Sequence, residues 1–231
     1  MASVQIGRSF ALSILAGVIA GGILAGLNLA IVRPSMSLIT EGIIDELAAD
    51  GEYDEEEFDS MVGSIYFTQT AGALAMGLGA GALLGGVRVF GKRTAGGIAD
   101  AILIAGVAWF VLYAVPAAKY PPSATALFYE EAAVEYYPLY FGYLTLSGLA
   151  ALAVVIAFRK SARKNKIFGM AALYLVIVAV TFFVFPSYDR DSSLDQSLLN
   201  SWRAATSAAM TGFWFSAGGI AGVLWKYGSK R

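Results

Sequence analysis

The chain has 231 residues, of which 58% are hydrophobic and 14% charged, and its formal net charge is −1. Soluble domains usually carry about 25% charged residues, so this composition excludes an ordinary water-soluble protein and indicates a membrane protein. Cysteine and histidine are both absent, which excludes disulfides, thiolate chemistry and imidazole metal ligands from this chain.

Six apolar stretches are long enough to cross a bilayer, for which a helix needs about 20 residues. Their continuous apolar character disfavours a β-barrel, whose strands alternate polar and apolar residues. We therefore predict an all-α integral membrane protein. It forms a single transmembrane domain over residues 1–231, a bundle of about six helices. The predicted spans are residues 10–32, 65–90, 98–115, 139–158, 167–185 and 204–225.

The basic residues are segregated, and they predict the orientation. Twelve of the 16 lie on the side that holds both termini, whereas Arg33, Lys119, Arg190 and Arg203 lie on the other side. Among the acidic residues, only Asp100 lies on the basic side. Because cytoplasmic loops are enriched in lysine and arginine, we expect both termini in the cytoplasm and acidic loops outside the plasma membrane.

Residues 33–64 form the predicted acidic extracytoplasmic loop. Pro34 predicts a break after the first span, and residues 35–49 have the periodicity of a short amphipathic helix. Asp50, Glu52 and Asp54 alternate as at the start of a calcium-binding loop, and they are the candidate metal ligands. That pattern then stops, because Glu55 stands where the loop requires glycine. We therefore prefer a solvated charged segment.

Small residues recur within the predicted spans. Glycines spaced four apart predict close contacts between helices, chiefly within one molecule. The pairs are Gly17/Gly21, Gly22/Gly26, Gly77/Gly81/Gly85 and Gly218/Gly222. The helix centres hold no charged residue. Most hydroxyls at depth should bond to their own helix, whereas the amides of Asn28 and Gln69 should contact other helices.

Two further segments stand at the predicted outer surface. Residues 116–122 hold three prolines, which predict a stiff extended segment, and aromatic residues follow it. The aromatic residues indicate either an interfacial belt or a docking surface. Residues 198–207 begin the sixth span. There Arg203 either extends into the headgroups or pairs with an acidic residue such as Asp195.

These motifs resemble the CbtA-type family of predicted cobalt transporter subunits. The resemblance rests on the first-helix residue Asn28 before Arg33-Pro34, on Lys119, Tyr120, Pro121 and Pro122, and on Leu198, Leu199, Trp202, Arg203, Ser207 and Trp214. It implies a small multi-helix membrane protein of cobalt uptake, often paired with a tiny histidine-bearing partner. Asn28, Lys119, Tyr120, Pro121, Pro122, Trp202, Arg203 and Ser207 are the family-motif or interface candidates.

Two functions remain open at this point. The first is a CbtA-like component of divalent metal (cobalt) transport. The alternative is a non-catalytic accessory subunit of a larger membrane complex, such as a membrane metalloenzyme. Neither is an enzyme, since no serine–histidine pair or zincin motif exists. The expected partners are the lipid bilayer and other membrane subunits or a small partner, with no nucleic acid. No cofactor is expected in the chain itself. A transported divalent cation would need carboxylates, carbonyls, a partner, or methionines such as Met36, Met61 and Met76.

Overall fold

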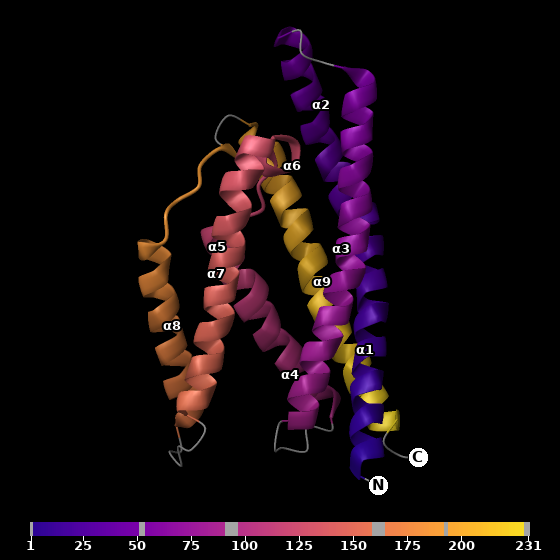
Figure 1. The fold of residues 1–231 in the computed structure, drawn as a ribbon, viewed down its shortest axis with the longest axis vertical. Helices are drawn as coiled ribbons and strands as arrows, with labels where there is room; N and C mark the ends of the chain where they lie inside the picture. The colour runs from indigo at the N-terminus through magenta and orange to yellow at the C-terminus, as the bar shows by residue number, and fades with distance from the viewer. Residues whose placement is uncertain (1, 51–53, 91–96, 159–164, 192–193, 229–231) are drawn as a thin grey trace. The chain divides into compact units, whose positions relative to one another are not determined.

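The structure is a computed structural model that describes residues 2–50, 54–90, 97–158, 165–191 and 194–228 (Figure 1). Six helical segments in these ranges are long and apolar enough to cross a membrane, which confirms the predicted all-α membrane protein. The elements are α1 (Ala2–Leu27), η1 (Asn28–Val32), α2 (Arg33–Asp50), α3 (Glu55–Phe90), α4 (Ile98–Trp109), η2 (Phe110–Ala114), α5 (Val115–Lys119), α6 (Thr125–Phe128), α7 (Glu130–Ala157), α8 (Lys166–Val184) and α9 (Gln196–Gly228), where η denotes a π-helix.

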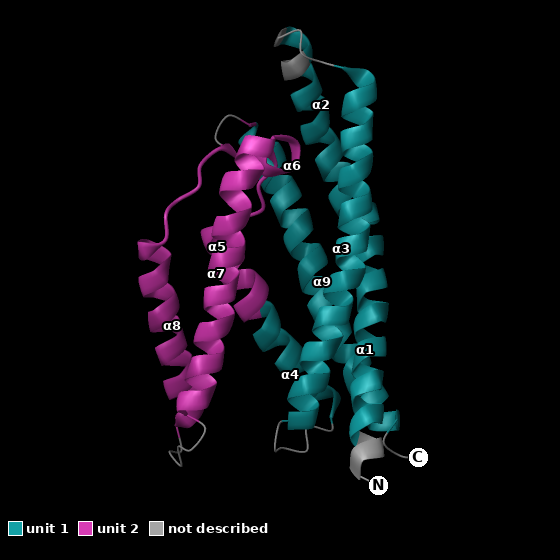
Figure 2. Ribbon diagram, in the orientation of Figure 1, with its two compact units in different colours: residues 1–109, 195–231 teal, residues 110–194 magenta. Residues whose placement is uncertain are grey.

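The chain divides into two compact units, coloured separately in Figure 2. Unit 1 comprises residues 1–109 and 195–231, and unit 2 comprises residues 110–194. The division falls inside the third apolar segment, between α4 and η2. Each unit is therefore described by itself.

A glycine seam joins α1 and α3 in unit 1. A Cβ atom on Gly81 would lie 2.6 Å from the Ser13 carbonyl oxygen, and one on Gly21 would lie 2.7 Å from the Ala73 carbonyl oxygen. A Cβ on Gly77 would meet Gly17 and Gly21 of α1. The backbones thus approach as closely as the spacing predicted. Gly22 and Gly26 differ, because a Cβ there would meet open space.

Helix α9 packs on both α1 and α4. Gly218 lies against Ala101 and Ala105 of α4, and Gly222 lies against Ile98. Near its C-terminal end, the indole Nε1 of Trp225 donates a 2.9 Å hydrogen bond to Ser13 Oγ of α1. The start of α1 and the end of α9 therefore lie side by side (Figure 1).

The predicted break at Pro34 is wrong, because α1, η1 and α2 form one uninterrupted helical segment. The backbone N–H of Arg33 donates to the Asn28 carbonyl oxygen, five residues earlier, which is the spacing of a π-helix. This local change of hydrogen-bond spacing accommodates the proline that follows, which has no N–H of its own.

Helix α3 is longer than a membrane is thick, and acidic residues occupy its first turn. The 36 residues of α3 span about 54 Å at 1.5 Å per residue, more than the roughly 30 Å of a hydrocarbon core. Glu55, Glu56 and Glu57 occupy its first turn, where carboxylates suit the positive end of the helix dipole. The surplus length is thus charged and lies at one end of the helix.

Unit 2 is built around α7, whose buried Ser147 and Tyr143 bond to neighbouring elements. Ser147 Oγ of α7 donates to the Val111 carbonyl oxygen of η2 at 2.7 Å and also bonds the Tyr174 hydroxyl of α8 at 2.7 Å. Tyr143 Oη donates to the Val178 carbonyl oxygen. Ser147 is an exception to the expectation that most hydroxyls at depth bond to their own helix, as those of Thr70 and Thr181 do. A π-helix leaves carbonyl groups in irregular positions, and Ser147 satisfies one of them.

The proline-rich segment is only partly extended. Pro116 lies near the start of α5, which continues the helical span from Ile98 through η2, and this span ends at Lys119. Residues 120–124 then run without a helix before α6 begins. The extended character is therefore confined to the part that follows Lys119.

Candidate functional site

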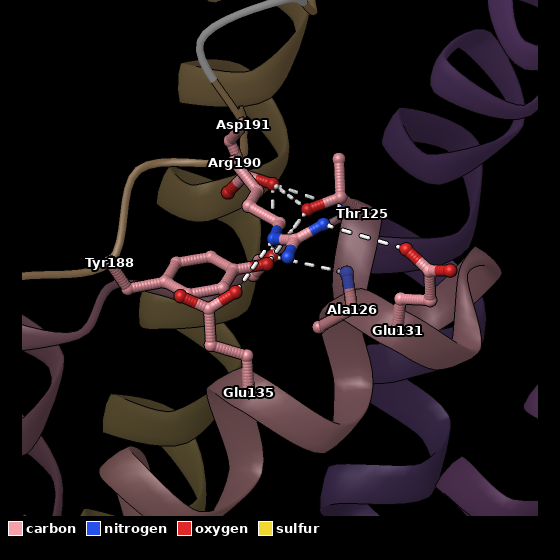
Figure 3. Close-up of polar contacts among 8 residues, drawn as sticks. Thr125, Ala126, Glu131, Glu135, Tyr188, Arg190 and Asp191 are labelled. Carbon is pink, nitrogen blue, oxygen red and sulfur yellow. Dashed lines mark hydrogen bonds and ion pairs between the residues drawn. The ribbon is translucent and has the colours of Figure 1, made fainter.

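The segment between α5 and α6 of unit 2 is held by a buried carboxylate, that of Asp191, which is 6% exposed (Figure 3). Its Oδ1 atom accepts hydrogen bonds from Ser123 Oγ at 2.9 Å, from the Thr125 backbone N–H at 3.1 Å and from Thr125 Oγ1 at 2.7 Å. The Tyr188 hydroxyl bonds both Ser123 and Thr125. Asp191 therefore joins the segment after α8 to the start of α6.

The Lys119-Tyr120-Pro121-Pro122 motif lies beside these contacts. We call residues 119–125 and 186–191 together the cap of unit 2. Tyr120 is 1% exposed and donates from its hydroxyl to the Pro186 carbonyl oxygen at 2.6 Å. Burial raises the pKa of this phenol above its ordinary value. Tyr136 Oη of α7 donates to the Pro121 carbonyl oxygen at 3.0 Å. The motif thus has a structural role, closing the end of unit 2.

Lys119 contributes a cation to this aromatic surface. Its Nζ atom lies 4.8 Å from the centroid of the Phe182 ring and 5.7 Å from that of the Tyr120 ring. Both distances fall within the range of cation–π attraction. The lysine is therefore held over aromatic faces.

An open pocket of about 470 Å³ adjoins the cap at the start of α7. Arg190 donates from Nε to Glu135 Oε2 at 2.7 Å, and its Nη1 lies 4.0 Å from Glu131 Oε2. The hydrogen bond to Glu135 raises the pKa of the exposed Arg190 guanidinium. The pocket is lined by Thr125, Phe128, Tyr129, Glu130, Glu131, Ala132 and Arg190. Its charged groups are exposed and already paired in part, so it has the character of a surface polar patch.

The motif of residues 198–207 lies in α9 of unit 1. The Lys119 motif belongs to unit 2. Leu199 and Trp202 are buried, whereas Arg203 and Ser207 are half-buried. Asp195 caps the helix, because its Oδ1 accepts from the Ser197 N–H at 2.7 Å. That backbone hydrogen bond lowers the pKa of the Asp195 carboxyl.

The candidate metal ligands are not brought together by the described residues. Asp54 is exposed and accepts a hydrogen bond from the Glu57 N–H at 3.1 Å, so it caps α3. Glu52 and the side chain of Asp50 lie outside the described residues. Within the described ranges, no group of three or more acidic residues is arranged to hold a metal ion.

The remaining polar candidates lie in unit 1. Asn28 is half-buried at the start of η1. The Gln69 amide Nε2 of α3 contacts Met36 Sδ of α2 at 3.6 Å, which confirms the expected contact with another helix. Met36 is 1% exposed, whereas Met76 is 40% exposed.

Among the residues that the structure describes, sequence reasoning missed four buried polar atoms of unit 1 that have no hydrogen-bond partner. They are Trp109 Nε1, Trp202 Nε1, Thr206 Oγ1 and Trp214 Nε1. Trp202 and Trp214 had entered the argument as residues of the family motif, and no periodicity in the sequence distinguishes a partnered indole from an unpartnered one. The missing partners become visible only once the helices are packed.

The comparison with known families settles the identity of the chain at the family level. The family described as "Probable cobalt transporter subunit (CbtA)" matches residues 7–226. The chain belongs to the CbtA family. The resemblance read from the motifs is thereby confirmed, and so is the interpretation as a CbtA-like membrane subunit of cobalt transport. Searches of curated proteins and of solved structures gave no match.

Proposed function

We propose that this CbtA-family chain is the membrane-spanning, ion-conducting subunit of a divalent cation uptake system, with cobalt as its cargo. The family match over nearly the whole chain carries the proposal. Six apolar helical segments supply the membrane scaffold that a transporter subunit needs. The chain conducts the ion and performs no chemistry on it.

Both termini lie in the cytoplasm in this proposal, and the acidic hairpin formed by α2 and α3 faces outward. The distribution of basic residues supports this orientation. An outward acidic surface attracts divalent cations over about a Debye length, roughly 10 Å at moderate ionic strength. In this proposal the negative charges of Asp50, Glu52 and Asp54 raise the local cation concentration near the acidic hairpin.

A partner completes the system. Cobalt prefers imidazole nitrogen together with oxygen ligands, and this chain contains no histidine or cysteine. Selective capture therefore belongs to another subunit that supplies nitrogen ligands, while this chain provides the crossing.

Uptake of radioactive cobalt in cells tests the proposal. Cells that express the chain together with the proteins encoded beside it should accumulate more cobalt than cells that express those proteins alone. Gentle detergent extraction should recover the chain with stoichiometric membrane partners. Equal uptake in both strains, with the chain correctly inserted, would contradict the conducting role.

The acidic surface is tested separately. Replacing Asp50, Glu52 and Asp54 together by the corresponding amides should lower uptake at low cobalt concentration and restore it at high concentration, because only local enrichment is lost. The matched control is the same triple change at Glu130, Glu131 and Asp189, which are exposed. Equal uptake by the first variant and the wild type at low cobalt would remove the capture role.

A further inference from the structure

The third apolar span is one continuous helical segment, Ile98–Lys119, and it belongs to both compact units. Its first half, α4, lies in unit 1, whereas its second half, η2 with α5, lies in unit 2 (Figure 2). Each of the other five spans that the described residues form lies within one unit. A movement of one unit against the other would therefore have to bend the third span.

The first half of the span is held closely against α9. A Cβ on Gly218 of α9 would lie 2.7 Å from Ala105 Cβ, and one on Gly222 would lie 2.6 Å from Ile98 Cα. The two helices thus approach as closely as glycine contacts permit over the first two turns of α4. Elements packed this closely deform little, so α4 behaves as part of unit 1.

The second half of the span is held against α7 of unit 2. Ser147 Oγ of α7 donates to the Val111 carbonyl oxygen at 2.7 Å. Just beyond the end of α5, the Tyr136 hydroxyl of α7 donates to the Tyr120 carbonyl oxygen at 3.3 Å, and the Tyr120 side chain is buried. Both ends of this half are therefore fixed to unit 2.

The hydrogen bonding of the span is irregular where its two halves meet. The π-helix η2 begins at Phe110, the first residue of unit 2. With π-type spacing, the Val111 carbonyl would pair with the N–H of residue 116, and that residue is Pro116, which has none. Ser147 supplies the missing donor from outside the helix. Bending concentrates where a helix lacks its own hydrogen bonds, and sharp kinks occur at proline and at π-helical turns.

The π-helix η1 has the same local pattern in a different setting. There the Arg33 N–H donates to the Asn28 carbonyl oxygen, and the next acceptor, the Leu29 carbonyl, has Pro34 five residues later. The helices on both sides of η1, α1 and α2, belong to unit 1. A π-helix followed by proline therefore does not by itself divide the chain. Within the described residues, its coincidence with a unit boundary is specific to η2.

We propose that η2 is a hinge, at which the third span bends when unit 2 moves against unit 1, while α4 stays with α9 and α5 stays with α7. Transporters often alternate their access by rocking one helical bundle against another. The use of this movement in cobalt transport rests on the proposed function. The inference adds the segment at which the movement takes place.

The movement is tested by double electron–electron resonance between spin labels in lipid nanodiscs. Because the chain has no cysteine, two introduced cysteines carry the only labels. The joining pair, S60C with S187C, has one label in each unit. The control pairs are S60C with S201C in unit 1 and S187C with A157C in unit 2. All four positions are exposed.

We expect two distance populations for the joining pair and a single narrow population for each control pair. This result would show that the units move as bodies. A single narrow distance for the joining pair, both without and with cobalt, would overturn the hinge. Two populations in a control pair would also overturn it, since the movement would then lie within a unit.

The role of η2 is tested by removing its irregularity. A π-type hydrogen bond encloses one residue more than an α-type bond, so deletion of Ala114 together with P116A restores α-type spacing. The joining pair should then show one population, and cobalt uptake per inserted molecule should fall about tenfold. The matched control is deletion of Ala30 together with P34A, which makes the same change in η1 and should leave both populations in place.

The outcomes separate the hinge from the transport function. Two unchanged populations in the inserted Ala114-deletion variant would overturn the assignment to η2. If that variant fails to insert, the label distances of the unaltered η2 still decide. Wild-type cobalt uptake with a single joining-pair distance would overturn the hinge and leave transport standing. Two joining-pair distances without cobalt uptake would overturn the transport function and leave the hinge standing.

Discussion

The two units solve the same problem of helix packing in different ways. In unit 1 the contacts between α1 and α3 are made by backbone against backbone, through glycines that leave no room for a Cβ. In unit 2 the helices are joined by hydroxyl groups, with Ser147, Tyr143 and Tyr174 bonding across α7, α8 and η2. Between helices in lipid, both close packing and hydrogen bonds provide attraction, because apolar side chains alone gain little over lipid tails.

The difference extends to the buried polar groups. The unpartnered indoles and hydroxyl lie in unit 1, whereas the buried Asp191 and Ser147 of unit 2 each hold several protein partners. A satisfied network fixes one arrangement, while an unsatisfied donor needs water or a ligand. Unit 2 therefore has the character of a rigid element.

A substitution in the glycine contact between α1 and α3 should give the largest loss of stability. Replacing Gly77 by valine forces side-chain atoms into the backbone of α1, so we expect a loss of about 3 kcal/mol or more and failure to insert as a folded protein. Expression level and thermal unfolding in detergent measure this. The control is G79V on the same helix, because a Cβ on Gly79 meets open space. A G77V variant as stable as G79V would refute the seam.

Removal of the buried Asp191 carboxylate of unit 2 should give the second largest loss of stability. D191A leaves the hydroxyl groups of Ser123 and Thr125 and one backbone N–H without their acceptor. We expect a destabilisation of about 2–3 kcal/mol, since hydrogen bonds to a charged group are worth more than neutral ones. The control is D189A, which removes an exposed aspartate two residues earlier. Equal unfolding temperatures for the two variants would mean that the cap does not stabilise unit 2.

Removal of the Ser147 hydroxyl, which bonds to the π-helix η2, should give a smaller loss of stability. S147A removes the donor to the Val111 carbonyl and a partner of the Tyr174 hydroxyl, and we expect a loss of about 1–2 kcal/mol. T70A serves as its control, because Thr70 is exposed and bonds only the Tyr66 carbonyl of its own helix. Thermal unfolding in nanodiscs compares the two. Should S147A unfold at the wild-type temperature, the hydroxyl would not be what joins these helices.

The comparison also shows which features the sequence could predict. Apolar runs of about 20 residues and the segregation of basic residues depend on the composition of a segment, so the six helices were predictable. The Gly17 and Gly77 contact followed from spacing alone, but Gly22 has the same spacing and faces open space. The orientation of a helix about its own axis decides between them, and packing sets that orientation.

The sites were less predictable for a related reason. The partners of Ser147 lie 27 and 36 residues away and those of Asp191 lie 66 and 68 residues away, and no local pattern reports such distances. The predicted helix break at Pro34 was wrong because a proline inside a membrane helix can be accommodated by a change to π-type hydrogen bonds. The motif residues Tyr120 and Trp202 were found through the family resemblance. Their physical roles, a buried hydroxyl anchor and an unpartnered indole, needed the folded chain.

The smallest expected loss of stability comes from removing the Asp195 carboxylate at the start of α9, and this loss depends on pH. The N–H groups of Ser197 and Leu198 donate to the Asp195 carboxylate and hold its pKa below the ordinary value of 3.8. A group whose pKa is depressed on folding adds stability above the unfolded-state pKa and loses it as the pH falls through the folded-state pKa. At neutral pH, D195A should therefore unfold slightly more easily than the wild type, whereas D195N, which can still accept the hydrogen bond, should fall between them.

Below the depressed pKa, the wild type and D195A should converge, because the protonated carboxyl no longer caps the helix as an anion. Unfolding temperatures of the three proteins in nanodiscs, measured from pH 7 down to about pH 2.5, decide this. A difference between wild type and D195A that persists undiminished at the acid end would show that the side chain acts through neutral contacts. The cap of α9 would then resemble the neutral hydroxyl contacts of unit 2, and charge would have no part in holding the start of that helix.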